Sequence, residues 1–264
     1  MPDPDAIESL LALRAKAHRI GAAPLTSAGD LVAWIDERSI ALVSGRSALP
    51  NAAEAIAGRA IEGSWWGDPD GSLIYRLLTA LELGESRPAV DDLVLVDGKR
   101  TLVSHRLVPA VCAVAADPER RRRVRDGLRT PARQLLDLLT DDRAVRAEDT
   151  GLTSAEFRKA RGALESGLLA RSTSVHTESG HHASVLEAFG LDEIASAGAA
   201  AASGEAALRA LFEGALRSAV VASRREMDRW FRFVEPEAAR RSGAIDGLGT
   251  RQLEADGGPW LTLL

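Results

Sequence analysis

The chain has 264 residues, of which 45% are hydrophobic and 27% charged, and its formal net charge is −5. This composition can form packed cores and excludes a disordered chain. The single cysteine, Cys112, excludes a disulfide framework and a zinc site built from several thiolates. No apolar run approaches the roughly 20 residues of a membrane span, and the acidic N-terminus lacks the features of a signal peptide. We therefore expect a globular, cytoplasmic protein without contact to a membrane.

Residues 1–118 predict a helical unit that ends in a β-hairpin. The helical patterns and one short apolar strand lie at residues 7–20, 31–40, 40–43, 51–61 and 73–83. Two apolar strands flank Asp97-Gly98 over residues 92–105, and Asp-Gly favours the tight turn of a hairpin because glycine accepts a positive φ. Because of its extra strand and a tryptophan-rich loop, we classify this stretch as a winged-helix-like domain.

Residues 119–194 predict a winged-helix domain. A short helix follows Pro131, and Thr153-Ser-Ala-Glu156 forms a capping box, in which each side chain bonds the backbone N–H of the other residue. The helix that follows places apolar residues three to four positions apart, which is typical of an amphipathic helix. A hairpin over residues 168–186 completes the order of two helices, a capped third helix and a hairpin.

Residues 195–264 repeat this order and predict a second winged-helix domain. An alanine-rich stretch at the start, 195–203, predicts a hinge. The helices and the closing hairpin are predicted at residues 204–218, 223–231, 235–245 and 250–264, and Ser223-Arg-Arg-Glu226 reads as a second capping box. The predicted hairpin turns recur about every 80 residues. The sequence thus predicts a mainly α protein with small β-hairpins, of the α+β class, built from tandem winged-helix modules.

A winged helix lays its third helix in the major groove of DNA and its hairpin, the wing, along the backbone. The candidate DNA contacts are Ser154, Arg158, Lys159 and Arg161 on the third helix of the middle domain, Arg171, His181 and His182 on its wing, and Arg224, Arg225, Arg240, Arg241 and Arg251 in the last domain. The densest basic cluster is the arginine run within residues 119–125. Duplex DNA favours such clusters through counterion release, whereas the alternative is an ordinary solvated helix face.

Two further groups of residues are candidates for binding. Trp65 and Trp66 lie in a loop rich in turn residues, where a tryptophan can stack on a base, and at least one of the pair is expected to pack in the core. His176, His181 and His182 could hold a metal with Glu178, but a wing tip lacks the rigid support that metal ligands need. We therefore expect no metal and no cofactor.

The sequence resembles the bacterial winged-helix DNA glycosylases, which excise alkylated or crosslinked bases, and their shorter uncharacterised relatives. The resemblance rests on residues 221–231, on the Ala-Arg-Arg helix and terminal hairpin that follow, and on Gly63-Ser-Trp-Trp-Gly67. It implies the fold and an association with duplex DNA. Those enzymes carry catalytic glutamines around an apolar residue in their N-terminal module. The only glutamines here, Gln134 and Gln252, lie outside that unit, so no catalytic residue is carried over.

The sequence therefore predicts a non-catalytic protein that binds double-stranded DNA. One alternative is a glycosylase-like hydrolase that acts on damaged bases through Asp68, Asp70 or Glu37, because a carboxyl group can activate water. Another alternative is a module whose winged helices bind a protein partner.

Overall fold

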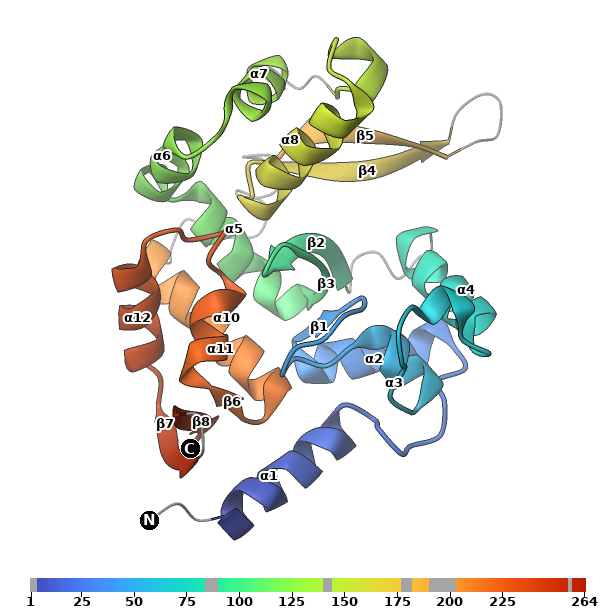
Figure 1. Cartoon of the computed structure of the whole chain (residues 1–264), viewed down its shortest axis with the longest axis vertical. Helices are drawn as coiled ribbons and strands as arrows, with labels where there is room; N and C mark the ends of the chain where they lie inside the picture. Colours follow the sequence, from blue (N-terminus) through green and yellow to red (C-terminus); the bar gives the residue numbers. More distant parts are fainter. Residues whose placement is uncertain (1–3, 84–89, 140–143, 177–181, 190–202, 256–257) are drawn as a thin grey trace.

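The computed structural model describes residues 4–83, 90–139, 144–176, 182–189, 203–255 and 258–264 (Figure 1). Helices account for 55% of the structure and strands for 18%, and all strands lie in small antiparallel sheets. The predicted α+β class is confirmed. No helix among the described residues is long and apolar enough to cross a membrane.

The N-terminal unit consists of helices that precede a three-stranded sheet. Its elements are α1 (Pro4–Ala17), α2 (Ala28–Arg38), β1 (Ile40–Leu42), α3 (Ala52–Ala57), the 3-10 helix η1 (Trp65–Gly67), α4 (Gly71–Leu83), β2 (Val90–Val96) and β3 (Lys99–Ser104). The predicted hairpin is confirmed, since Asp97 and Gly98 both have positive φ values, 50° and 70°, as a tight primed turn requires. The predicted extra strand, β1, pairs with β3, so the sheet order is β1-β3-β2.

The 3-10 helix η2 (His105–Leu107) and α5 (Val108–Ala116) lead into the middle unit. The middle unit consists of α6 (Pro118–Asp126), α7 (Thr130–Leu138), the 3-10 helix η3 (Ala147–Asp149), α8 (Ser154–Ser166), β4 (Ala170–His176) and β5 (His182–Ala188). The capping box at the start of α8 is confirmed. The N–H of Glu156 donates to Thr153 Oγ1 at 3.3 Å, and the N–H of Thr153 donates to Glu156 Oε2 at 3.0 Å.

The C-terminal unit repeats the arrangement of the N-terminal one. Its elements are α10 (Gly204–Ala219), β6 (Ala222–Ser223), α11 (Arg224–Trp230), α12 (Ala238–Asp246), β7 (Thr250–Ala255) and β8 (Gly258–Leu263). Of the second predicted capping box, the serine cap is confirmed, but the glutamate bonds elsewhere. Ser223 does cap α11, but the Glu226 carboxylate accepts bonds from Ser47 Oγ at 3.2 Å and from the N–H of Ala48, in the N-terminal unit. The predicted hinge lies mostly outside the described residues.

One order of elements recurs in the three units. A helix leads to a short strand, two helices follow, and a hairpin closes the unit. The short strand pairs with the second strand of the hairpin, β1 with β3 and β6 with β8. In the middle unit the short strand is reduced to one β-bridge, between Val145 and Leu186 of β5.

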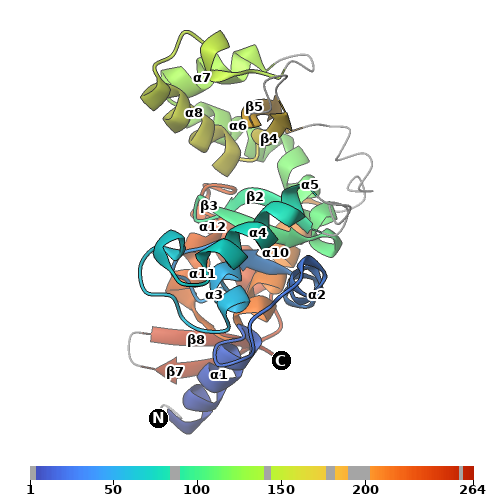
Figure 2. The same cartoon turned by 90° about the vertical axis from the view of Figure 1, so that its right-hand side faces the viewer.

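The hydrophobic core is divided among three clusters of buried side chains. One cluster belongs to the N-terminal unit and another to the middle unit. The third and largest joins the N-terminal sheet and α5 to the C-terminal unit, with α10 packed against α5. Figures 1 and 2 show the consequence: the middle unit extends to one side, while the N- and C-terminal units form a common body.

Candidate nucleic-acid interface

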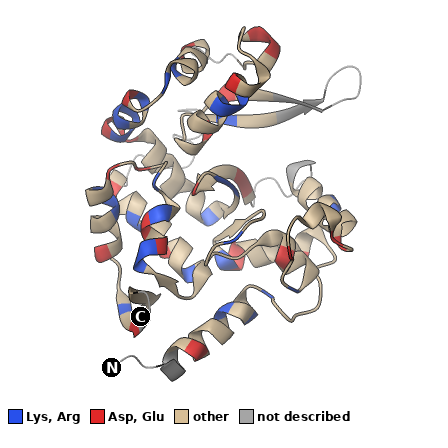
Figure 3. Ribbon diagram, in the orientation of Figure 1, with Lys and Arg blue, Asp and Glu red and all other residues tan. Residues whose placement is uncertain are grey.

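The third helix of the middle unit, α8, presents a basic outer face. Its apolar stripe, Phe157, Ala160 and Leu164, is buried against the core of that unit. Arg158 and Lys159 lie off this stripe and are exposed, and neither is paired with another described residue. Figure 3 shows that α8 carries both basic and acidic residues. These two side chains are therefore available to an anionic ligand.

The other candidates in the middle unit are more constrained. Ser154 is exposed in the first turn of α8. Arg161 is paired with Glu165 one turn later at 3.6 Å, and Arg171 is paired with Glu187 on the neighbouring strand, also at 3.6 Å. His182 begins β5, whereas His181 lies outside the described residues. Two of the predicted cations on this unit thus have carboxylate partners of their own.

The two arginines on α12 face the interior of the protein, contrary to the expectation of an exposed basic face. Arg240 forms ion pairs with Asp117 at 2.8 Å and Glu235 at 3.4 Å. Arg241 is only 7% exposed and donates to the carbonyl oxygens of Glu235 at 2.9 Å and Asp228 at 3.0 Å. Both guanidinium groups are therefore occupied within the chain and are not available to DNA.

The remaining candidates of the C-terminal unit are spread over two elements. Arg224 donates to Ser242 Oγ at 2.7 Å and is paired with Asp246. Arg225 on α11 and Arg251 on β7 are exposed and unpaired within the described part of the chain. Arg229 on α11 is likewise exposed and unpaired within the described residues, so the free cations of this unit are three arginines on α11 and β7, and none lies on α12, its third helix.

The tryptophan loop divides its two rings between core and surface. Trp65 packs against the N-terminal core, as expected for one of the pair. Trp66 is 67% exposed and stacks on Trp65 with 4.0 Å between ring centroids, and its ring lies 5.6 Å from that of Tyr75 on α4. The neighbouring Arg76 is exposed and has no ion-pair partner among the described residues. Tyr75 and Arg76 were not predicted as binding residues, although they lie in the first turn of the helix predicted over residues 73–83.

The carboxylates considered for catalysis are held by arginines. Arg59 is paired with Asp68 at 2.6 Å and with Asp70 at 2.9 Å, and its hydrogen bonds to Asp68 lower the pKa of that carboxyl group. Glu37 is paired with Arg38. A carboxylate is a weaker general base toward water when its pKa is lowered, so this arrangement favours a structural role for Asp68, and the ion pair with the same arginine favours one for Asp70.

A different carboxyl group, Glu54, was missed by the sequence analysis. Burial raises its pKa, and it lines a cavity of about 110 Å³ together with Asn51 and Trp65. This volume lies below the range of about 300–1,000 Å³ that is typical of ligand pockets. The cavity therefore gives no support to base excision.

The arginine run of α6 is divided by the period of the helix. Arg120 is fully buried and donates to the carbonyl oxygens of Val234 and Gly167, and Arg123 is paired with the buried Glu235 at 3.0 Å. These two arginines join α6 to the C-terminal unit and are not free for DNA. The run was predicted as one basic cluster, without this division.

Within the described residues, no three His, Cys, Asp or Glu side chains gather in a group that could hold a metal ion. Glu178 and His181, which belong to the histidine group considered above, lie outside those residues.

No protein-family model, no curated protein and no solved structure matches the chain. A functional assignment must therefore be argued from the geometry described above.

Proposed function

We propose that residues 1–118, 119–194 and 195–264 form three winged-helix domains and that the chain binds double-stranded DNA without catalysing a reaction. The domain assignment is supported by the order of elements that recurs in the three units. It is also supported by the pairing of β1 with β3 and of β6 with β8, which gives both three-stranded sheets the same strand order. In proteins with this motif the third helix contacts the major groove.

The observation that carries the proposal is the pair of free cations on α8. Of the three third helices, α12 has both of its arginines turned inward, and α4 carries only Arg76 on its surface. Arg158 and Lys159 are adjacent, exposed and unpaired within the described chain. The middle domain is therefore the best placed to contact phosphates, with Ser154 at the helix N-terminus as a further donor.

The exposed aromatic residues support a second contact in the N-terminal domain. Trp66 and Tyr75 are 67% and 53% exposed, and Arg76 follows on the same helix. The segment between α3 and α4, which contains Trp66, lies along the same edge of the molecule as α8 in Figure 2. An aromatic ring beside a cation is suited to contact a base and its phosphate together.

The overall charge limits how the protein can bind. A net charge of −5 disfavours binding of DNA by the surface as a whole, so we expect binding to depend on local cations such as Arg158 and Lys159 and to weaken steeply as salt is added. Because phosphate contacts carry no sequence information, α8 needs base contacts in addition to them for specificity.

The test is fluorescence anisotropy of a labelled duplex with the full chain at low salt. We expect Arg158→Gln/Lys159→Gln to weaken binding by about tenfold or more, because two phosphate contacts are lost. The matched control is Arg209→Gln/Arg217→Gln on α10, which removes the same charge from exposed positions paired with Glu205 and Glu213. An equal loss in both variants, or no binding by the unmodified chain, would contradict the proposal. A folded chain that fails to bind DNA would favour the protein-partner alternative.

A further inference from the structure

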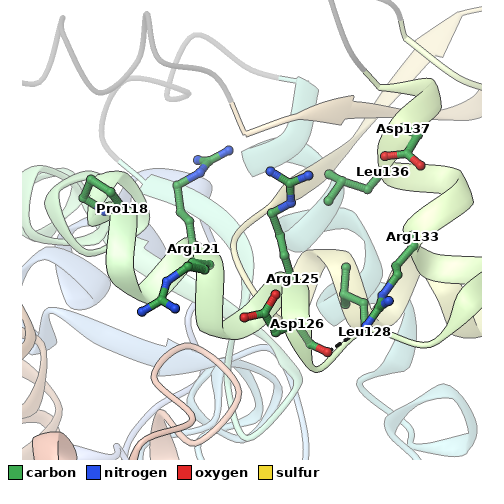
Figure 4. A pocket seen from close by; sticks show the side chains of 9 residues that line it. Pro118, Arg121, Arg125, Asp126, Leu128, Arg133, Leu136 and Asp137 are labelled. Carbon is green, nitrogen blue, oxygen red and sulfur yellow. Dashed lines mark hydrogen bonds between the residues drawn. The ribbon is translucent and has the colours of Figure 1, made fainter.

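The outward half of the α6 arginine run lines a cavity. While Arg120 and Arg123 turn toward the C-terminal unit, Arg121, Arg122 and Arg125 of α6 line a cavity together with Arg133 of α7. The cavity has a volume of about 720 Å³. Its lining is Pro118, Arg121, Arg122, Arg125, Asp126, Leu128, Arg133, Leu136 and Asp137 (Figure 4).

Two of the arginines that line the cavity donate to backbone carbonyl groups. Arg133 donates to the carbonyl oxygen of Asp126 at 2.8 Å, which fixes α7 to the end of α6 (Figure 4). Arg121 donates to the carbonyl oxygen of Ala115 at 3.4 Å. Because these acceptors are uncharged, neither bond neutralises a guanidinium group. The walls of the cavity are two helices whose apolar sides belong to the core of the middle unit, so it is a formed part of the fold.

Positive charge is in excess inside this cavity. Four arginines line it against two carboxylates, and none of the four forms an ion pair with another described residue. Burial lowers the pKa of Arg121, and the nearby charge of Arg125 lowers it further. Four guanidinium groups against two carboxylates leave a net positive charge in the cavity, and a bound anion would reduce the repulsion between the arginines.

We propose that this cavity binds a small oligophosphate, either a nucleoside triphosphate or an inorganic polyphosphate. Guanidinium groups bind phosphate oxygens in pairs of parallel hydrogen bonds, so four of them can hold several phosphate groups. The volume lies in the range of small-molecule sites, and Leu128 and Leu136 add an apolar surface. No residue of α8 or of the β4–β5 hairpin is among those that line it. The site is therefore distinct from the proposed DNA surface and does not depend on it.

The test is isothermal titration calorimetry of the full chain with sodium tripolyphosphate and, separately, with ATP. We expect saturable binding of at least one probe, and about 100-fold weaker binding in Arg121→Gln/Arg125→Gln, which corresponds to about 2.8 kcal/mol. The charge-matched control, Arg209→Gln/Arg217→Gln, should bind as tightly as the unmodified chain. Circular dichroism verifies that each variant is folded, and Arg122→Gln provides a second, exposed substitution in the cavity.

Each outcome of this titration decides the matter. Binding of ATP alone supports a nucleotide as the ligand, and binding of tripolyphosphate by itself or with ATP supports the phosphate chain as the recognised part. No saturable heat with either probe up to about 1 mM overturns the proposal. An equal loss in the cavity and control variants overturns it as well. If Arg121→Gln/Arg125→Gln weakens only duplex binding, the cavity belongs to the DNA surface and the small-ligand site is refuted.

Discussion

Replacing Arg120 with methionine tests whether one buried guanidinium group holds the three units together. Arg120 is fully buried and donates to carbonyl oxygens of all three units: Val234 at 2.6 Å, Ala115 at 3.4 Å, and Gly167. Burial lowers its pKa to about 10, so it remains charged at neutral pH. The Arg120→Met chain keeps most of the volume but leaves these carbonyl groups without their donor.

The expected loss of stability follows from these bonds. A hydrogen bond to a charged group contributes about 1.5–3 kcal/mol, so the bonds to Val234 and Gly167 together contribute about 3–6 kcal/mol. Removing a buried charge recovers part of this sum, because its desolvation is no longer required. We therefore expect Arg120→Met to lower the free energy of unfolding by about 3 kcal/mol, measured by urea denaturation.

The control for this experiment is Arg122→Met on the same helix. Arg122 is exposed, so its replacement should change the free energy of unfolding by no more than about 0.5 kcal/mol. The middle unit has its own hydrophobic cluster, so we also expect the unmodified chain to unfold in one transition and Arg120→Met to unfold in two. The reasoning is refuted if the two variants unfold at the same urea concentration.

Two further predictions concern stability. Burial, aided by nearby arginine charges, lowers the pKa of His18 from 6.5 to about 4. The unfolded chain therefore binds more protons between these values, and stability should fall by up to about 3 kcal/mol as the pH falls from 6.5 to 4; His18→Gln should remove that part of the pH dependence in urea titrations. A Cβ on Gly58 (φ +70°) would lie 2.1 Å from the carbonyl oxygen of Ala22, whereas one on Gly63 (φ +84°) meets nothing within 4 Å. Gly63→Ala should lower the free energy of unfolding by about 1 kcal/mol, and Gly58→Ala should lower it by about 2 kcal/mol more, as measured by thermal unfolding. Equal losses of stability in the two variants would contradict the packing argument.

The elements that the sequence predicted well have local signals. The Asp97-Gly98 turn and the box of Thr153 and Glu156 involve residues at most three positions apart, and the chemistry of a turn or a helix cap acts over that distance. The three hairpins and the order of helices before them could therefore be read from the sequence.

The contacts that the sequence could not give are those between units. Glu226 bonds Ser47 and Ala48 across 178 or more positions, and Arg240 is paired with Asp117 across 123 positions. Nothing near these residues in the sequence indicates the partner. For that reason α12 was predicted as a DNA-contacting helix, although its arginines are internal.

The division of the α6 arginines was accessible to sequence reasoning. Arg120, Arg123 and the buried Val124 are spaced three and four positions apart, the spacing of one buried helix face. The same reasoning places Arg121, Arg122 and Arg125 on the outer side. The sequence could not show that α7 lies beside α6, so that Arg133 of α7 lines one cavity together with these three arginines.

The proposal that α8 binds DNA is tested most directly by the salt dependence of duplex binding. The slope of log K against log salt falls by about 0.9 for each phosphate contact that is lost. The slope for Arg158→Gln/Lys159→Gln should therefore be shallower than that of the unmodified chain by about 2, while Arg209→Gln/Arg217→Gln leaves it unchanged. Identical slopes for all three chains would show that α8 does not contact the phosphates and would contradict the proposal.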